Sequence, residues 1–154
     1  MLSVTSEYAI RAMVYITQQG DEEPVLARTI ASELEIPANY VSKILRDMAH
    51  GGLLKSSRGV GGGFRLARDA RRIRLGDIVT PFENVPHNAR CPFGNAVCSD
   101  EHPCAAHDYW RDVKAAYDDF LEHTTLAMVA RERAPRAAPK RKRRLPADRQ
   151  RRAR

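Results

Sequence analysis

The fold of this chain is decided by residues 38–67, which read ANYVSKILRDMAHGGLLKSSRGVGGGFRLA. In the first half, apolar side chains recur at the i, i+3, i+4 and i+7 spacing of one helix face: Val41, Ile44, Leu45 and Met48. The other face is polar and carries Asn39, Ser42, Lys43 and Arg46. Pro37 suits the first turn of a helix and Gly51 suits its end, so the pattern predicts a helix over residues 38–50.

A glycine-rich turn with a short strand on each side follows this helix. Residues 53–57 and 64–67 are predicted to be the strands, and residues 58–63 the turn between them. Glycines allow positive φ values and let the backbone approach a phosphate chain closely. The residues expected to lie against such a chain are Arg58, Gly61, Gly62 and Arg65. A nucleotide-binding loop is excluded, because no Lys-Ser/Thr follows the glycines and a strand stands where that loop needs a helix.

Two further helices are predicted upstream. Residues 8–16 form the first, with Thr5 or Ser6 available as its N-cap. Its inward side chains are expected to include Ile10, Met13 and Val14. Residues 26–34 form the second, which a turn of three or four residues joins to the polar-faced helix, as in a helix-turn-helix. With the strands added, residues 1–80 are predicted to be a DNA-binding winged helix-turn-helix, in a fold that is mostly α with a small β wing. The polar face of the helix over 38–50, Asn39 included, is expected to contact the DNA.

Three cysteines lie in the next segment, residues 81–104, which contains several prolines and is predicted to be a loop ordered by a bound group. Cys91, Cys98 and Cys104 are an odd set in a chain expected to be cytoplasmic, where disulfides are disfavoured, so metal ligation is expected. Their wide gaps suit an iron–sulfur cluster better than a structural zinc. His107 lies one helical turn after Cys104 and can reach the group that Cys104 binds.

A long helix is predicted over residues 105–131. Its apolar residues are spaced alternately by about three and four positions, as in a coiled-coil seam: Ala106, Trp110, Val113, Tyr117, Phe120, Thr124 and Ala127. A winged helix has little body left to cover so long a stripe. We therefore expect a second copy of the chain to cover it, which makes this the dimerisation helix of a homodimer.

Positive charge is concentrated in two places. The net charge is +7, but residues 131–154 carry 12 Lys+Arg and 2 Asp+Glu, whereas residues 1–130 carry 14 and 17. Within the body, residues 55–74 hold seven basic side chains and one acidic side chain, so this end is expected to face phosphate. Residues 132–154 are predicted to be a disordered basic tail. Because no apolar run approaches the ~20 residues of a membrane span and residues 1–19 are too polar for a signal peptide, we expect a cytoplasmic protein without a membrane partner.

The whole arrangement resembles the Rrf2 family of transcription regulators, which includes the iron–sulfur regulators IscR, NsrR and RirA. The resemblance covers residues 1 to about 130 and rests on YAIRAM at 8–13, IPANY at 36–40, SRGVGGGF at 57–64, the cysteine triplet, HDYWRDV at 107–113 and TTL at 124–126. It implies a homodimer joined through the long helix, with a cluster at the dimer interface that modulates binding to a palindromic operator. It also implies that Tyr40, Ser42, Lys43 and Arg46 read a groove of double-stranded DNA and that Arg58 reaches the minor groove.

The resemblance offers two residues as the fourth ligand. His107 stands where IscR-like members have a histidine, and Glu7 stands where NsrR-like members have a helix-one carboxylate donated by the partner subunit. His107 is favoured. Histidine ligation suits a two-iron (2Fe-2S) cluster, which is favoured, whereas a carboxylate would fit a four-iron (4Fe-4S) cluster that nitric oxide attacks.

The expected function is a DNA-binding transcriptional regulator, with repression favoured, whose cluster senses iron, redox state or nitric oxide. One alternative is a zinc-binding or thiol-based winged-helix regulator. Another is a structural protein that coats nucleic acid through its basic tail. An enzyme with a small-molecule substrate is not expected, because no paired carboxylates, nucleophile–base set or cofactor loop is found in the sequence.

Overall fold

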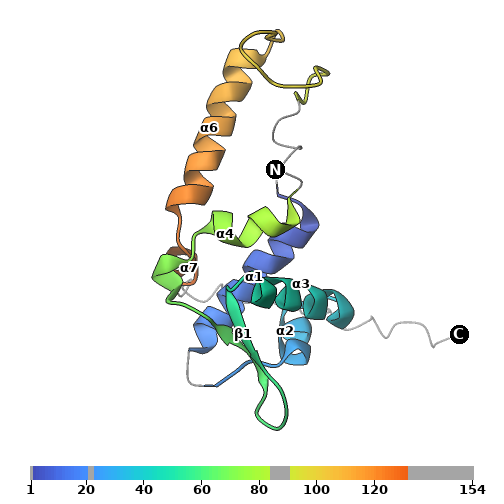
Figure 1. Cartoon of the computed structure of the whole chain (residues 1–154), viewed down its shortest axis with the longest axis vertical. Coiled ribbons are helices and arrows are strands. Elements are labelled where there is room, and N and C mark those ends of the chain that lie inside the picture. Colours follow the sequence, from blue (N-terminus) through green and yellow to red (C-terminus); the bar gives the residue numbers. More distant parts are fainter. Residues whose placement is uncertain (1, 21–22, 84–90, 132–154) are drawn as a thin grey trace, which may run out of the picture.

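The computed structural model describes residues 2–20, 23–83 and 91–131. It has a helical body with a small β-hairpin at one end, and a single helix, α6, extends away from the body (Figure 1). This confirms the mostly helical fold with a small β wing. The predicted basic tail at 132–154 and the loop residues 84–90 lie outside the described residues.

Helix α1 (Val4–Gln19) packs against α2, α3, α4 and α7, so it lies at the centre of the body. It begins earlier than predicted. Ser3 is its N-cap, because the Ser3 side chain accepts a hydrogen bond from the Ser6 amide at 3.2 Å. The prediction of Thr5 or Ser6 as the cap was therefore wrong, and Ser6 is instead fully buried.

The buried face of α1 consists mainly of small side chains: Ser6, Ala9, Ala12, Met13 and Ile16. Met13 is buried, as predicted. Ile10 and Val14 were also predicted to point inward, but they are only half-buried and lie at the edge of the core. Alanines let the neighbouring helices pack close to the α1 backbone. Close packing therefore favours burial of the face with Ala9 and Ala12 over burial of the face with Ile10 and Val14.

Helices α2 (Ala27–Leu34) and α3 (Ala38–His50) form the helix-turn-helix, and their bounds agree with the prediction to within one residue. Glu35 turns the chain between them with a φ of 55°, and Ile36 places its side chain in the core. The apolar residues predicted for the inner face of α3 are all buried: Val41, Ile44, Leu45 and Met48. The polar face of α3 is consequently directed away from the core.

Strands β1 (Leu54–Ser57) and β2 (Gly63–Leu66) pair antiparallel and form the wing, as predicted. A bridge from Val25 adds to this pair, which the sequence did not indicate. The Val25 amide donates to the Phe64 carbonyl at 2.8 Å, and the Phe64 amide donates to the Val25 carbonyl at 2.9 Å. The wing is thus attached to the segment that precedes α2.

Three short elements follow the wing: η1 (Ala70–Arg72), α4 (Leu75–Val79) and η2 (Thr80–Phe82). The apolar side chains of α4 are buried, and α4 packs against both α1 and α6. It is therefore the element through which the extended helix joins the body.

The long helix predicted over 105–131 is two helices, α6 (His107–His123) and α7 (Leu126–Val129). Backbone pairing interrupts it, because the Leu75 amide donates to the Thr124 carbonyl at 2.9 Å and the Leu126 amide donates to the Ile73 carbonyl at 2.8 Å. Leu126 is fully buried, so α7 is anchored in the core while α6 extends outward (Figure 1). No helix in the described part of the chain is long and apolar enough to cross a membrane.

Candidate metal centre and nucleic-acid interface

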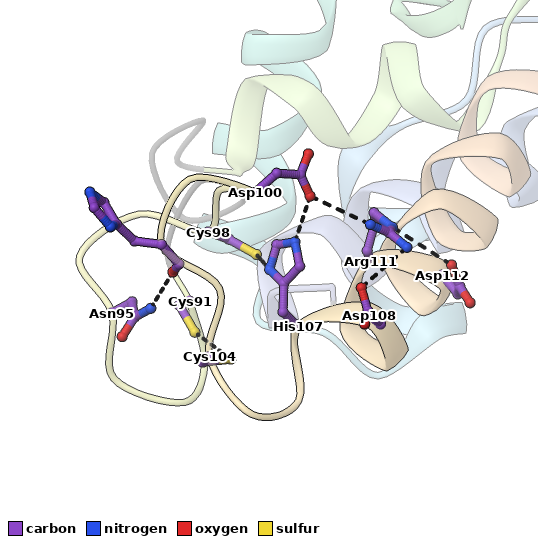
Figure 2. A network of polar contacts seen from close by, with 10 residues as sticks. Cys91, Asn95, Cys98, Asp100, Cys104, His107, Asp108, Arg111 and Asp112 are labelled. Atoms are coloured by element: carbon purple, nitrogen blue, oxygen red, sulfur yellow. Dashed lines mark hydrogen bonds and ion pairs between the residues drawn. The ribbon is translucent and has the colours of Figure 1, made fainter.

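The three cysteines and His107 lie together in the loop that precedes α6 and in the first turn of that helix (Figure 2). They form two pairs. The Sγ atoms of Cys91 and Cys104 are 3.6 Å apart, and Cys98 Sγ is 3.7 Å from His107 Nδ1. All three cysteines are free thiols, and Cys91 and His107 are buried, with 8% and 7% of their surfaces exposed.

The environment of the Cys91 thiol lowers its pKa. The Asn95 amide lowers the pKa of this thiol most, burial opposes that effect, and the Phe93 amide, the Cys104 side chain and the Gly94 amide lower the pKa further. The turn is closed by the Asn95 side chain, whose Nδ2 donates to the His102 carbonyl at 2.8 Å. Since thiolates are the metal-binding form of cysteine, this loop favours the ionised donor.

Asp100 contacts His107 from the side opposite Cys98, and sequence reasoning missed it (Figure 2). His107 Nε2 is 2.8 Å from Asp100 Oδ1, and Arg111 Nη1 is 3.4 Å from the same oxygen. The hydrogen bond from His107 lowers the pKa of Asp100, with a smaller contribution from Arg111. The sequence offered two carboxylates between the cysteines, Asp100 and Glu101, and which of them meets His107 depends on how the loop folds.

The donor set fits a thiolate-bound metal group. Cys91, Cys98, Cys104 and His107 supply soft sulfur and imidazole ligands of the kind that iron–sulfur clusters and zinc both use. Within the described residues, however, no three His, Cys, Asp or Glu side chains converge on a single metal position. Glu7 is exposed on the first turn of α1, and the polar network of the loop in Figure 2 does not include it.

The outward face of α3 carries most of the residues predicted to contact DNA. Asn39, Tyr40, Lys43 and Arg46 are exposed. Ser42 is half-buried, and its hydroxyl donates to the Ala38 carbonyl at 2.8 Å, so this hydroxyl already has a partner within the helix. The Tyr40 hydroxyl lies 2.7 Å from Thr5 Oγ1, which links α3 to the beginning of α1.

In the wing, Arg58, Gly61 and Arg65 are exposed, whereas Gly62 is buried. A Cβ on Gly62 would lie 2.5 Å from the Ser57 carbonyl oxygen, so Gly62 is required for the turn itself. Lys55 is exposed and pairs directly across the hairpin with Arg65. Two like charges side by side repel each other, and an anion between them would relieve that repulsion.

Comparisons with known proteins identify the family of this chain. Residues 2–132 match the Rrf2 family model, described as "Iron-dependent Transcriptional regulator". The chain is 31% identical over 126 residues to the transcriptional regulator IscR of Serratia proteamaculans, covering 82% of this chain and 76% of that protein. It is 28% identical over 131 residues to IscR of Vibrio campbellii, covering 85% of this chain and 77% of that protein.

Solved structures of transcriptional regulators match the fold of this chain. The structure of T. potens IscR is 28% identical and matches with a TM-score of 0.66, covering 84% of this chain and 85% of that chain. CymR of B. subtilis, described as a global cysteine regulator, matches with a TM-score of 0.72 over 84% of this chain and 95% of that chain, and its 23% identity shows a shared fold. Its relatives are transcriptional regulators and not enzymes. From the family match, together with the helices and the wing, we conclude that this chain belongs to the Rrf2 family of transcriptional regulators.

Proposed function

We propose that this chain is a homodimeric, cytoplasmic regulator that binds a palindromic operator and whose operator affinity is set by an iron–sulfur cluster. The observation that carries the proposal is the gathering of three free thiols and His107 where the cysteine loop enters α6, a helix that exposes three large apolar side chains. Repression is the favoured outcome, and the signal is iron supply, redox state or nitric oxide.

Cys91, Cys98 and Cys104 would hold the cluster, with His107 as the favoured fourth ligand. The close approach of Cys98 to His107 Nδ1 supports His107, since the two ligands already face each other. The cluster would supply a redox-active and oxidant-labile group that fixes the loop. A two-iron cluster is favoured with histidine ligation, and Glu7 of the partner subunit with a four-iron cluster is the alternative.

The exposed face of α6 supports the homodimer. Large apolar side chains stand open to solvent along it: Tyr109 is 80%, Val113 58% and Phe120 48% exposed. They recur at helical spacing on one side of α6, whereas Trp110 and Tyr117 of the predicted seam are half-buried on another side. Large apolar side chains exposed on one side of a helix mark an interaction site, and a second α6 is the partner whose apolar side chains match them.

A chain of packed elements connects the loop to the DNA-binding surface. The loop leads into α6, α6 packs on α4, α4 packs on α1, and α1 packs on α3. In a dimer, the two α3 helices must be about 34–36 Å apart to enter successive turns of the major groove. Gain or loss of the cluster would shift α6, and so the spacing of the two α3 helices and the fit to the operator.

The test is anaerobic purification of the full chain, followed by visible absorption and assay of iron and acid-labile sulfide. Operator fragments selected from random DNA are then titrated with the cluster-bound and cluster-free protein. We expect a coloured protein whose affinity changes when the cluster is removed. Zinc in place of iron would favour the zinc-binding alternative, and equal affinity with and without the cluster would contradict the regulatory role.

The coating alternative is tested by truncation after Arg131. An operator-binding regulator should keep its sequence preference without the basic tail, because α3 and the wing read the bases. A protein that coats nucleic acid through its tail should lose nearly all binding. Retained preference would therefore eliminate the coating function.

A further inference from the structure

The imidazole of His107 is held between two different partners. Its Nδ1 faces Cys98 Sγ at 3.7 Å, and its Nε2 faces Asp100 Oδ1 at 2.8 Å. The ring is buried, while the Asp100 side chain is 80% exposed and reaches it from the loop (Figure 2). The two ring nitrogens therefore have unlike surroundings, one sulfur and one carboxylate.

This arrangement decides which nitrogen can bind a metal. A neutral imidazole has one nitrogen with a free lone pair and one that carries a proton, and hydrogen bonding to the second nitrogen selects the tautomer. An ionised carboxylate accepts hydrogen bonds and donates none. Asp100 therefore stabilises the proton on Nε2, and the lone pair is left on Nδ1, on the side of the thiols.

We propose that Asp100 is a positioning residue that selects Nδ1 of His107 as the ligating atom and holds the ring in place for it. The inference rests on the proposed function, in which the cysteine loop binds a cluster. A carboxylate behind a metal-binding histidine orients the ring and raises the basicity of the ligating nitrogen. The same geometry favours His107 over Glu7 as the fourth ligand, since Asp100 already orients the His107 ring toward the thiols.

Arg111 fixes Asp100 in turn. It lies one turn after His107 on α6, and its Nη1 is 3.4 Å from Asp100 Oδ1. Its Nη2 is 3.3 Å from Asp108 Oδ1, so Asp108 pairs with the same guanidinium, whereas the polar contacts of the His107 ring within the described residues are with Cys98 and Asp100. Asp108 is 81% exposed, close to the 80% of Asp100. It is therefore a matched control for the loss of one carboxylate beside Arg111.

The experiment compares Asp100→Ala, Asp100→Asn and Asp108→Ala with the wild type, all as full chains purified anaerobically. Cluster loss to a ferrous-iron chelator is followed by visible absorbance. Removal of the partner of a metal-bound histidine is expected to speed this loss by about 10-fold in Asp100→Ala. Asp100→Asn keeps an acceptor oxygen and should fall between the wild type and Asp100→Ala, while Asp108→Ala should match the wild type.

A second readout reports the ligating atom. Pulsed electron paramagnetic resonance of the reduced cluster, with histidine labelled with ¹⁵N at Nδ1 alone, shows whether the bound nitrogen is Nδ1. We expect one nitrogen coupling in the wild type and in Asp108→Ala, and an altered or mixed coupling in Asp100→Ala. Thermal unfolding of the variants should be unchanged, because Asp100 is an exposed loop residue.

The possible failures are distinguishable. A wild type without iron and sulfide would overturn the proposed function, and the role of Asp100 with it. A wild type that holds a cluster, together with an Asp100→Ala protein that matches Asp108→Ala in both chelation rate and nitrogen coupling, would overturn the role of Asp100 alone.

Discussion

Glu83 shows how a single side chain joins distant parts of this chain. Its Oε1 accepts hydrogen bonds from the Ser3 amide at 2.9 Å and from the Ser6 hydroxyl at 2.5 Å. Burial raises the pKa of this carboxyl, but the hydrogen bonds from Ser6 and Ser3 hold it below the ordinary value of 4.5. The residue that follows η2 is thereby attached to the first turn of α1.

These hydrogen bonds predict a pH dependence of stability. Because the pKa is lower in the folded chain, the contribution is present above the unfolded pKa and is lost as the pH falls through the folded pKa. Glu83→Gln should lower the free energy of unfolding by about 1 kcal/mol near neutral pH, after allowance for partial exposure, and by less in acid. Urea unfolding across the acidic range measures this, with the exposed Glu33→Gln as control. A constant difference at all pH values would contradict the assignment.

Gly62 is predicted to stabilise the folded chain because it allows the tight turn of the wing. A methyl group there would lie 2.5 Å from the Ser57 carbonyl oxygen and 2.9 Å from that of Gly59. Gly62→Ala should therefore lower the free energy of unfolding by roughly 1–3 kcal/mol, the usual result of overpacking. Chemical denaturation measures it. Val60→Ala, at a fully exposed position of the same turn, is the control, and equal stabilities of the two variants would show that the turn relaxes freely.

Among the elements, helices α6 and α7 have different roles. Strand-like pairing of Thr124 with Leu75 and of Leu126 with Ile73 ends α6 and turns the chain back toward the core. Helix α7 then closes the core with Leu126, while α6 remains extended with an apolar face. One continuous helix would have carried Leu126 out of the core.

The anchoring role of α7 predicts a large effect of Leu126→Ala. Truncation of a fully buried leucine costs about 2–5 kcal/mol of stability, through lost burial and the cavity that remains. Met128→Ala, on the same short helix at a position 54% exposed, should cost far less. Denaturant midpoints of the two variants provide the comparison. A small effect of Leu126→Ala would mean that α7 is dispensable for the core.

The apolar face of α6 predicts which substitution separates the subunits. Phe120→Lys places a charge on that face, so we expect a monomer in sedimentation and a loss of operator affinity. Ala115→Lys places the same charge about 140° away around the helix and should leave the dimer intact. A dimeric Phe120→Lys protein would place the interface elsewhere.

The charge of the molecule as a whole is unevenly distributed. The net charge of +7 comes from residues 131–154, since residues 1–130 carry 14 Lys+Arg and 17 Asp+Glu. The wing and α3 nevertheless expose basic side chains at one end: Lys43, Arg46, Lys55, Arg58 and Arg65. The body can therefore present a positive surface to DNA despite its acidic total.

This distribution predicts the salt dependence of DNA binding. Each phosphate contact releases counterions and adds about 0.9 to the slope of log affinity against log salt. Truncation after Arg131 should reduce that slope and weaken binding to all sequences, while the ratio of operator to random affinity is kept. Lys55→Ala should lower the slope by about 1. Fluorescence anisotropy at several salt concentrations measures the slope for both variants. An unchanged slope would exclude phosphate contacts from the basic tail in the truncated chain, or from Lys55 in Lys55→Ala.

The local elements were predictable from the sequence because their causes are local. Apolar spacing at Val41, Ile44, Leu45 and Met48 defines the inner face of α3 at any position in the fold, and the glycines of the wing impose the hairpin through their own backbone. The thiols and His107 were identifiable as one donor set, since their chemistry and spacing along the chain are sequence properties. The residues that end α6, by contrast, carry no breaker signal.

Long-range contacts were decided only by the tertiary structure. Thr124 and Thr125 end α6 because backbone groups more than forty residues earlier pair with this stretch, and Ser3 caps α1 within a site completed by Glu83. Asp100 meets His107 because the cysteine loop folds back on α6. The sequence by itself determined which residue types are available for the winged helix and for metal binding. The packing of segments far apart in the chain decided where helices end and which carboxylate meets which ligand, because those choices depend on partners that local spacing does not specify.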